Sequence, residues 1–528
     1  MAGATLTDIC FMFEVHQPLR LNRSFHLDLL TRPPASKKDL FELYFDSSLN
    51  KHIFDRVTRK CYLPTNNIIL SEIERFKQEK KQFKVSYGIS GVFIEQCERW
   101  NPELLDSFRQ LAKTGCVEFL EETYYHSLAS LFGPDRTEFI EQIKMHRQLM
   151  KDLLHYEPKV FENTECLYNN AIAKTVADMG YKAIITEGVE RVLGWRSPNF
   201  IYKARNASIP VLLRNYRLSD DIGFRFSSTW WNEWPLTALK YASWLAAIQG
   251  QTVVIFIDYE TFGEHQWPET GIHEFLKWLP GEVLKRDHLY WRTPSEVVNL
   301  HSPVGEIDAH EFNSVSWADL ERDPSAWISN PMQITSYEFL KGLEPFVKGL
   351  GDKFLLTLWR YLQMSDHLYY MSVKGGGPGD VHCYFNPSGN PIDAFVTFSN
   401  IITDFEARIL QELQKPELAA KWVLRRLPAE GRFTFFFEFA RPTNVTVYDM
   451  FEFAKAVNSI PVKSLQYHVE RGDFENWVSQ VLGDKKLAER IAAVSREKLA
   501  DEALRKRLAL VVNARVKELE ELAAKGKV

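Results

Sequence analysis

The stretch of residues 253–267 constrains the fold of this 528-residue chain more than any other. It begins with five apolar residues, most of them β-branched, which is the pattern of a strand buried on both faces. Four ionisable side chains then follow within eight residues, interleaved with aromatic residues: Asp258, Glu260, Glu264 and His265. An α/β barrel or a doubly wound sheet presents its active site in this way, at the carboxyl end of an apolar strand. An acidic loop without a function is the plain alternative.

Short apolar runs alternate with amphipathic segments from residue 8 to about residue 300. The apolar runs predict strands at residues 9–13, 83–87, 117–120, 159–161, 182–185, 211–213, 253–257 and 289–291. The amphipathic segments predict helices between most of them, most clearly at residues 66–80, 102–113, 136–155, 170–179, 236–248 and 272–286. Repeated strand–helix units indicate a parallel sheet, and seven or eight of them indicate a closed or nearly closed barrel over residues 1–300.

Polar clusters follow four of these predicted strands. They are Glu14-Val15-His16-Gln17-Pro18, Glu118 with Glu121-Glu122-Thr123-Tyr124-Tyr125-His126, Glu162-Asn163-Thr164-Glu165, and Asp258. Because the carboxyl ends of parallel strands lie on one face of a barrel, we expect all four clusters to converge there. This convergence is the strongest indication from the residues alone that the chain is an enzyme.

Strand–helix alternation gives way to helical segments after residue 300. We expect helices around residues 331–350, 352–362 and 391–415, with a glycine-rich loop at residues 374–380. The segment 363–370, which contains Asp366 and His367, allows two interpretations. It is either a plain helix with a solvated Asp–His pair, or part of a helical subdomain (residues 301–427) that brings both side chains to the barrel mouth.

A boundary near Leu427-Pro428 separates residues 428–528 from the rest of the chain. A short apolar strand at residues 433–437 precedes helices that run to the end of the sequence. Residues 485–525 are rich in Ala, Leu, Glu, Lys and Arg at helical spacing, which is typical of a solvated helical hairpin. We therefore expect a separate helical module, with docking or homo-oligomerisation as its role.

Charge and hydropathy exclude several classes of partner. The net charge of −5 is spread along the chain without basic clusters before the tail, which argues against nucleic acid. No run approaches 18 apolar residues, and the N-terminus lacks the basic and apolar parts of a signal peptide. The six cysteines are scattered and lack metal-ligand spacing, so we interpret them as reduced and buried. These features predict a soluble cytoplasmic protein with no membrane partner.

Aromatic residues make up 13% of the chain, including 14 Trp and 20 Tyr. Packing in the core accounts for most of the aromatic residues. Trp and Tyr beside carboxylates, as in Trp230-Trp231-Asn232-Glu233-Trp234, instead fit a polar ligand with flat apolar faces, such as a sugar.

The clusters provide the two carboxyl groups that glycosidic bond cleavage requires. One group attacks the anomeric carbon or activates water, and the other protonates the leaving oxygen. Glu165 lies among neighbours that can hydrogen-bond an ionised nucleophile, and Asp258 emerges from an apolar strand among aromatic residues. Partial desolvation there would raise the pKa of Asp258, as a general acid requires. Glu165 and Asp258 are therefore the best pair, and a retaining mechanism would place them about 5 to 5.5 Å apart.

A metal site is the rival interpretation. Zinc or manganese ligands could come from His16, Glu118, His126, Asp258 and His265. No HExxH-type spacing supports this arrangement. The sequence also lacks the GxSxG elbow of serine hydrolases and the GxxxxGK[ST] and GxGxxG phosphate-binding turns.

Five short motifs, taken in order, resemble the conserved regions of glycoside hydrolase family 57. Members of this family are retaining enzymes that act on α-glucans, and the resemblance is to the α-amylase-type members. The five motifs are His16-Gln17-Pro18; Gly115-Cys116-Val117-Glu118 running into Glu122-Thr123-Tyr124-Tyr125-His126; Asn163-Thr164-Glu165; Asp258-Tyr259-Glu260-Thr261-Phe262-Gly263-Glu264-His265; and Thr293-Pro294-Ser295-Glu296. The fourth motif is distinctive, and the motifs span residues 7–300. The resemblance extends through Ser316-Trp317-Ala318-Asp319 and Ser365-Asp366-His367 to about residue 425.

The resemblance implies an α/β fold, an incomplete (β/α)7 barrel followed by an α-helical bundle that completes the cleft. It also implies that Glu165 is the nucleophile and Asp258 the general acid/base, with no cofactor and no metal. Residues 293–296 are expected to be supporting structure. Together with the aromatic cluster, the motifs give the expected substrate-binding residues: His16, Glu118, His126, Trp230, His265, Trp317 and Asp366.

We therefore expect an enzyme that cleaves α-1,4 bonds of starch, glycogen or maltooligosaccharides through a covalent glycosyl-enzyme intermediate. A 4-α-glucanotransferase and a branching enzyme are the alternatives, because they share the catalytic pair and differ in whether water or a sugar hydroxyl reaches the intermediate. A non-catalytic glucan-binding protein is an alternative from another class. Such a protein would tolerate loss of Glu165 or Asp258, and both are present.

Overall fold

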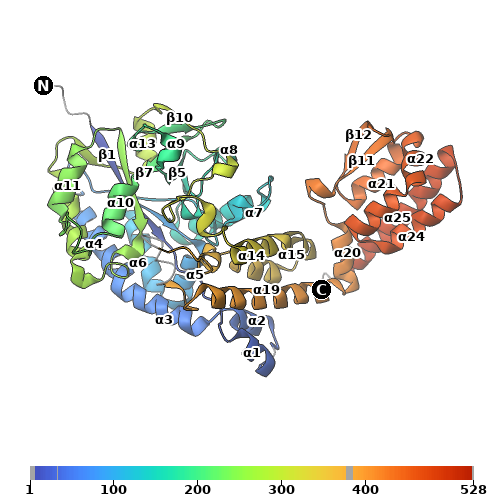
Figure 1. Ribbon diagram of the computed structural model, residues 1–528, viewed down its shortest axis with the longest axis horizontal. Coiled ribbons are helices and arrows are strands. Elements are labelled where there is room, and N and C mark those ends of the chain that lie inside the picture. The colour runs from blue at the N-terminus through green and yellow to red at the C-terminus, as the bar shows by residue number, and fades with distance from the viewer. Residues whose placement is uncertain (1–5, 33, 376–384, 526–528) are drawn as a thin grey trace. The chain divides into compact units, whose positions relative to one another are not determined.

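The computed structural model describes residues 6–32, 34–375 and 385–525 (Figure 1). Contacts divide the chain into two compact units, of which the first contains Met1–Lys341 and Arg360–Asn400 and the second Gly342–Trp359 and Ile401–Val528. The predicted domain boundaries at residues 300 and 427 stay a prediction. Among the described residues, no helix combines the length and the apolar character that crossing a membrane requires.

Seven parallel strands of the first unit form a curled sheet. In spatial order they are β4 (Val160–Glu162), β5 (Ala183–Glu187), β7 (Pro210–Arg214), β8 (Thr252–Asp258), β1 (Thr7–Val15), β2 (Val85–Ile89) and β3 (Val117–Phe119). An isolated parallel bridge between Glu121 and Phe161 links the segment after β3 to β4, so the first and last strands approach each other. The incomplete (β/α)7 barrel that the sequence predicts is confirmed.

Strands β1 and β8 form the centre of the sheet. All nine residues of β1 and six of the seven residues of β8 are buried, because both faces of each strand are covered. Burying each Val, Ile or Phe side chain contributes about 1.5–3 kcal/mol. The parallel register pairs Glu14 with Asp258 at the carboxyl end, where the apolar pattern stops. The same two strands that carry the core therefore carry polar groups to one rim.

Three further strands extend this sheet: β6 (Tyr202–Ala204), β9 (Leu289–Trp291) and β10 (Gly305–Ile307). Strand β9 forms where the sequence predicts it and pairs with the amino-terminal end of β1. The sequence analysis did not predict β6 and β10, whose three-residue lengths leave little hydrophobic pattern to recognise.

Helices surround the sheet (Figure 1). They are α3 (Ser47–Val57), α4 (Leu63–Arg75), α5 (Gly91–Trp100), α6 (Pro102–Lys113), α7 (Thr137–Leu149), α8 (Asn170–Asp178), α10 (Tyr216–Gly223), α11 (Ala238–Ala247), α12 (Ile272–Leu284) and α13 (Pro294–Leu300), with the short helices α1 (Phe25–Thr31), α2 (Lys37–Tyr44) and α9 (Glu190–Leu193). All six predicted helices of residues 66–286 are present, with ends that differ by a few residues. Helices α3 to α6 and α10 to α12 share one buried core with β1, β2, β3 and β8. Helices α7 and α8 pack in a second core with β4, β5 and β7.

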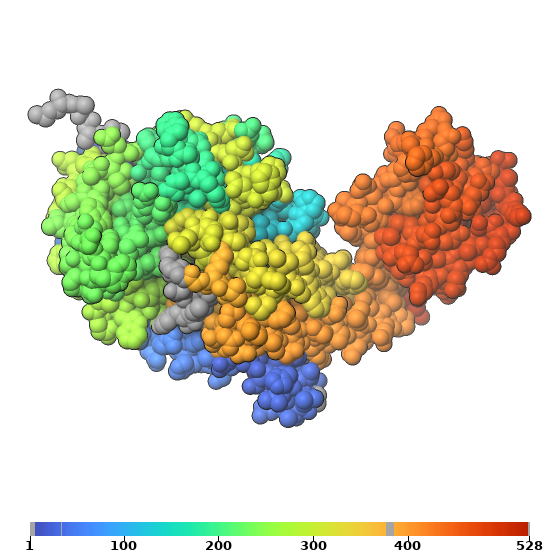
Figure 2. Space-filling model, viewed as in Figure 1, coloured from blue at the N-terminus to red at the C-terminus, as the bar shows by residue number. Residues whose placement is uncertain are grey.

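The chain after residue 300 adds helices to the first unit: α14 (Pro331–Gly342), α17 (Ser365–Tyr369) and the beginning of α19 (Pro391–Leu413). On the face shown in Figure 2, the yellow segment that follows residue 300 lies against the green segments of the barrel. Helix α17 reaches the strand ends, because the backbone N–H of Ser365 donates to the carbonyl of His126.

The second unit has a core of its own. It contains α15 (Glu344–Leu350), α16 (Lys353–Tyr361) apart from its last turn, α20 (Pro416–Leu424), the antiparallel strands β11 (Phe433–Glu438) and β12 (Arg441–Val447), α21 (Met450–Ser459), α22 (Val462–Arg471), α23 (Asp473–Trp477), α24 (Lys485–Arg496) and α25 (Asp501–Lys525). The predicted strand at 433–437 forms, and β12 pairs with it. The predicted hairpin of α24 and α25 also forms, but its apolar face is buried, with Leu487, Ile491 and Leu508 in the core.

Candidate active site

A cavity of about 210 Å³ opens where the strands of the barrel end. Its lining comes from β1, β8, the turn after β4 and α17, which are far apart in sequence. The charged and imidazole side chains in this lining include Glu14, His16, His126, Glu165, Arg214, Asp220, Asp258, Glu260, Glu264, His265, Arg322 and Asp366. The four polar clusters that follow strands in the sequence all contribute to this region.

Glu165 is held at the cavity wall in a constrained turn. Its backbone is left-handed, with φ 59° and ψ 26°, which a residue with a side chain seldom adopts. Its carbonyl accepts hydrogen bonds from Ser316 Oγ at 2.9 Å and from the N–H of Trp317 at 3.2 Å, which hold the turn. Its carboxylate accepts from Trp317 Nε1 at 2.6 Å and from Ser365 Oγ at 3.1 Å. Two donors therefore fix the carboxyl group of Glu165, whose side chain remains 19% exposed.

Asp258 ends β8 and faces a different environment. Burial, and after it the negative charge of Glu165, raise the pKa of Asp258 to about 7 against the opposing charges of Arg214 and His126. A carboxyl group with this pKa carries a proton in about half of the molecules at pH 7 and in most of them below it. The two carboxyl groups of the cavity are therefore set up for different tasks.

Two stacked histidines lie beside this pair. The rings of His16 and His126 are 4.1 Å apart with an interplanar angle of 18°. Nδ1 of His16 is 2.7 Å from Ser90 Oγ, and its Nε2 is 3.1 Å from Asp366 Oδ2. Burial and the neighbouring His126 lower the pKa of His16. The His16 and His126 rings lower the pKa of Asp366 against the effect of burial.

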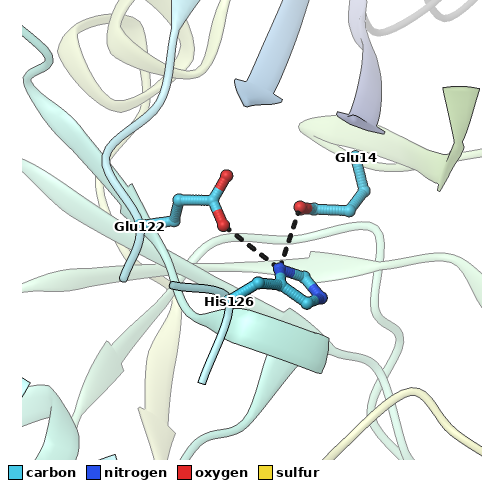
Figure 3. Close-up of side chains that lie close together, drawn as sticks. All are labelled: Glu14, Glu122 and His126. Carbon is cyan, nitrogen blue, oxygen red and sulfur yellow. Dashed lines mark hydrogen bonds and ion pairs between the residues drawn. The ribbon is translucent and has the colours of Figure 1, made fainter. Parts of the chain in front are cut away.

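His126 also connects the cavity to a buried group of carboxylates. Its Nδ1 lies 3.2 Å from Glu122 Oε2 and 3.4 Å from Glu14 Oε1, and Figure 3 shows both carboxylates turned toward that nitrogen. Its Nε2 lies 3.6 Å from Glu165 Oε1. Burial alone would lower the pKa of His126, but hydrogen bonds to Glu122 and Glu165 and the charge of Glu14 raise it well above its ordinary value.

A closed ring of buried ion pairs contributes Arg214, Asp220 and Arg322 to the cavity lining. Arg214 donates to Glu187 at 2.8 Å and to Asp220 at 2.7 Å, and Arg322 donates to the same two carboxylates at 2.8 Å and 3.0 Å. The sequence analysis missed all four residues. Glu187 and Arg214 end β5 and β7, so their position at strand ends was the available signal.

The structure brings seven of the predicted site residues to one cavity: His16, His126, Glu165, Asp258, His265, Trp317 and Asp366. Segment 363–370 therefore brings Asp366 to the barrel mouth, as the second interpretation of this segment expects. That interpretation does not describe His367, which is buried away from the lining with Nε2 3.3 Å from the carbonyl of Tyr361.

Two predicted substrate-binding residues are not brought to the cavity. The carboxylate of Glu118 accepts hydrogen bonds from the N–H and Oγ of Ser295, and neither residue belongs to the cavity lining. Trp230 is 80% exposed in the loop between α10 and α11. Thr293 and Glu296 form a capping box at the start of α13, in agreement with a supporting role.

The predicted set of zinc or manganese ligands does not come together either, because Ser295 holds Glu118, and Ser90 and Asp366 hold His16. A different group, Glu14, Glu122 and His126, has ligand atoms within 4.8 Å of one another. The predicted loop at residues 374–380 and Cys383 lie largely outside the described residues.

The parallel barrel and its carboxylate-lined cavity define an enzyme of the α/β-barrel class. The sequence profile of glycosyl hydrolase family 57 matches residues 10–310. A protein of Methanocaldococcus jannaschii named "Putative alpha-amylase" is 49% identical over 417 residues, which cover 78% of this chain and 86% of that relative. The chain therefore belongs to glycosyl hydrolase family 57.

Solved structures agree with this assignment of the fold. A GH57 branching enzyme from Thermococcus kodakaraensis matches with a TM-score of 0.53 at 14% identity, covering 77% of this chain and 94% of that chain. An exo-type maltose-forming amylase from Pyrococcus sp. ST04 matches with a TM-score of 0.50 at 11% identity, covering 98% and 95%.

Proposed function

We propose that the protein is a retaining, α-glucan-active glycosidase of the α-amylase type. It cleaves α-1,4 bonds of starch, glycogen or maltooligosaccharides through a covalent glycosyl-enzyme intermediate. The observation that carries this proposal is the pair of carboxyl groups in one cavity. Glu165 accepts two hydrogen bonds, whereas the pKa of Asp258 is raised to about 7. The name of the 49% identical relative supports the amylase activity.

The proposed reaction uses these two groups in sequence. A carboxylate oxygen of Glu165 attacks the anomeric carbon, and Asp258 gives its proton to the glycosidic oxygen as the bond breaks. The glucosyl unit is then esterified to Glu165, and Asp258 is ionised. A water molecule next attacks the anomeric carbon while Asp258 takes its proton, which releases the sugar with its original α configuration.

Product analysis tests the activity. The purified chain is incubated with maltoheptaose and with soluble starch, and reducing ends and product lengths are followed together. A rise in reducing ends with short products is expected for the amylase. Redistribution into shorter and longer chains without that rise would identify a 4-α-glucanotransferase, and new α-1,6 linkages in starch would identify a branching enzyme. No change with either substrate would favour a non-catalytic glucan-binding protein.

Azide rescue tests the two roles separately. In Glu165→Ala, azide enters from the face that the carboxylate leaves open, so an α-glycosyl fluoride should yield the β-glycosyl azide. In Asp258→Ala, azide attacks the intact intermediate and should yield the α-glycosyl azide. The reverse pattern would exchange the two roles and overturn the assignment. Glu72→Gln, which changes a buried carboxylate on α4 paired with Arg75, is the control expected to retain activity.

We also propose the cytoplasm as the compartment, because five buried cysteines of the described chain carry free thiols. For the C-terminal module (residues 428–528) we propose docking or self-association. Light scattering of the full chain tests self-association, and a concentration-independent monomer mass would leave docking as the proposed role.

A further inference from the structure

Four ionisable side chains meet beside the cavity, and two of them, Glu14 and His126, belong to its lining. They are Glu14 at the end of β1, Glu162 at the end of β4, and Glu122 and His126 from the segment after β3. Their exposed fractions are 2%, 0%, 0% and 4%. Three carboxylates and a single imidazole are thus enclosed together, which requires compensation because buried charges are strongly destabilising when unpaired.

Several oxygens in this group have no hydrogen-bond donor among the described residues. These are both oxygens of Glu14, Oε1 of Glu122 and Oε2 of Glu162. Three of them surround one small space beside Gly88 on β2. A carbon atom placed on the Cα of Gly88 would lie 3.0 Å from Glu14 Oε2, 3.6 Å from Glu162 Oε2 and 3.7 Å from Glu122 Oε1.

We propose that this cluster binds a divalent first-row metal ion, Mn²⁺ or Zn²⁺, through Glu14, Glu122 and Nδ1 of His126. The three ligand atoms lie within 4.8 Å of one another. Glu122 Oε2 and Glu14 Oε1 lie 3.2 Å and 3.4 Å from Nδ1 of His126, which is the spacing of neighbouring ligands around an ion bound at about 2.1 Å. Figure 3 shows both carboxylates directed at the same imidazole nitrogen. Glu162 is not one of the three ligands, but its carboxylate adds a further negative charge beside Gly88.

The donor set decides the class of metal. Ca²⁺ and Mg²⁺ take oxygen ligands and bind imidazole poorly, whereas Mn²⁺ and Zn²⁺ accept imidazole nitrogen and carboxylate oxygen together. The family resemblance implies no metal, so this inference goes beyond it. The predicted metal set shares only His126 with the proposed one.

The ion would position the nucleophile without touching the substrate. With Nδ1 of His126 bound to the metal, the ring proton resides on Nε2, which lies 3.6 Å from Glu165 Oε1. Metal-bound histidines commonly donate their second N–H to a carboxylate, which fixes the ring orientation. This consequence rests on the proposed role of Glu165, but the metal site itself does not.

The rival to a metal ion is a proton. A proton shared between the neighbouring carboxyl groups of Glu14 and Glu162 would neutralise one of them, and a protonated His126 would balance Glu122. The two explanations differ in how they respond to loss of a carboxylate. Glu122→Gln removes a ligand from a metal site, whereas in a proton-sharing cluster it removes a repulsive charge.

The test is elemental analysis of the full chain after dialysis into metal-free buffer, followed by titration with MnCl₂ monitored by electron paramagnetic resonance. We expect about one equivalent of metal, as purified or after addition of Mn²⁺. Glu122→Gln should weaken Mn²⁺ binding by about 10- to 100-fold. The buried carboxylate variant Glu118→Gln is the matched control, because Glu118 is held by Ser295 and should leave metal binding unchanged.

A second variant keeps the test decisive should Glu122→Gln fail to fold. Gly88→Ala retains all four side chains and places a methyl group 3.0 to 3.7 Å from one oxygen of each carboxylate, so it should shift the carboxylates and also weaken Mn²⁺ binding. Metal content below about one tenth of an equivalent, together with no saturable Mn²⁺ binding by the wild-type chain, would overturn the proposal. So would a rise in Tm for Glu122→Gln with unchanged Mn²⁺ affinity. Metal content and Mn²⁺ affinity do not depend on catalytic activity, so a failure of the metal proposal can be distinguished from a failure of the proposed function.

Discussion

The indole Nε1 of Trp317 donates a hydrogen bond of 2.6 Å to Oε2 of Glu165. Trp317 belongs to the segment after the barrel, and its ring packs on Phe256 of β8 with 5.0 Å between centroids. The backbone N–H of the same residue also donates to the carbonyl of Glu165. One residue from outside the barrel therefore fixes both the backbone turn and the carboxylate of the proposed nucleophile.

Replacing Trp317 by Phe should lower kcat by about 10- to 100-fold. A hydrogen bond to a charged group contributes about 1.5–3 kcal/mol, and each 1.4 kcal/mol corresponds to a factor of ten in rate. The change keeps an aromatic ring against Phe256 and removes only the donor. Steady-state kinetics on maltoheptaose measure the effect. Trp327→Phe is the control, because the buried indole N–H of Trp327 has no acceptor among the described residues; equal losses in both variants would contradict the prediction.

The pKa of Asp258 sets the pH dependence. Its folded-state pKa is raised to about 7, so the group is protonated below pH 7 and loses its proton above it. As a general acid it acts in the protonated form, so kcat/KM on maltoheptaose should fall about tenfold per pH unit above pH 7. An α-glycosyl fluoride has a leaving group that needs no proton, and its kcat/KM should lack this alkaline decline. The same decline with both substrates would argue against Asp258 as the acid.

The fold was predictable because the apolar runs are long enough to recognise. Strands such as β1 and β8 are buried on both faces, so their sequences are continuous apolar runs followed by polar residues. The position of the proposed catalytic pair in the cavity was predictable for the same reason, since Glu165 and Asp258 follow strands. Short strands such as β6 were missed because three residues carry no periodicity.

The rest of the site depends on side-chain direction and long-range packing. Successive side chains of a strand point to opposite faces, and Glu118 of β3 points toward Ser295 instead of the cavity. Trp230 lies in a loop whose position no local pattern determines. The left-handed turn at Glu165 is held by Trp317, more than 150 residues away along the chain, so its geometry cannot be read from the motif.

The ring of buried ion pairs should be important for stability. Glu187 is 2% exposed and accepts hydrogen bonds from both Arg214 and Arg322. Glu187→Gln leaves two buried guanidinium groups with one shared carboxylate, which should lower the free energy of unfolding by about 3–5 kcal/mol. Urea denaturation of the full chain measures the first unfolding transition. Glu190→Gln removes an exposed pair with Arg217 and should change stability by less than about 1 kcal/mol. A loss of less than about 1 kcal/mol for Glu187→Gln would contradict the prediction.

Gly263 in the fourth motif should tolerate no side chain. Its φ is +138°, and a Cβ there would lie 2.2 Å from the carbonyl oxygen of Lys60. Backbone strain and overpacking each cost about 1–3 kcal/mol, so Gly263→Ala should lower the free energy of unfolding by about 2–6 kcal/mol. It should also lower kcat, because the same loop continues from Asp258 to His265. Gly271→Ala is the matched control: its φ is +87° with no atom within 4 Å, so it should cost only about 1 kcal/mol. Denaturation and kinetics on both variants distinguish the two sites, and equal effects would show that the contact with Lys60 does not constrain the loop.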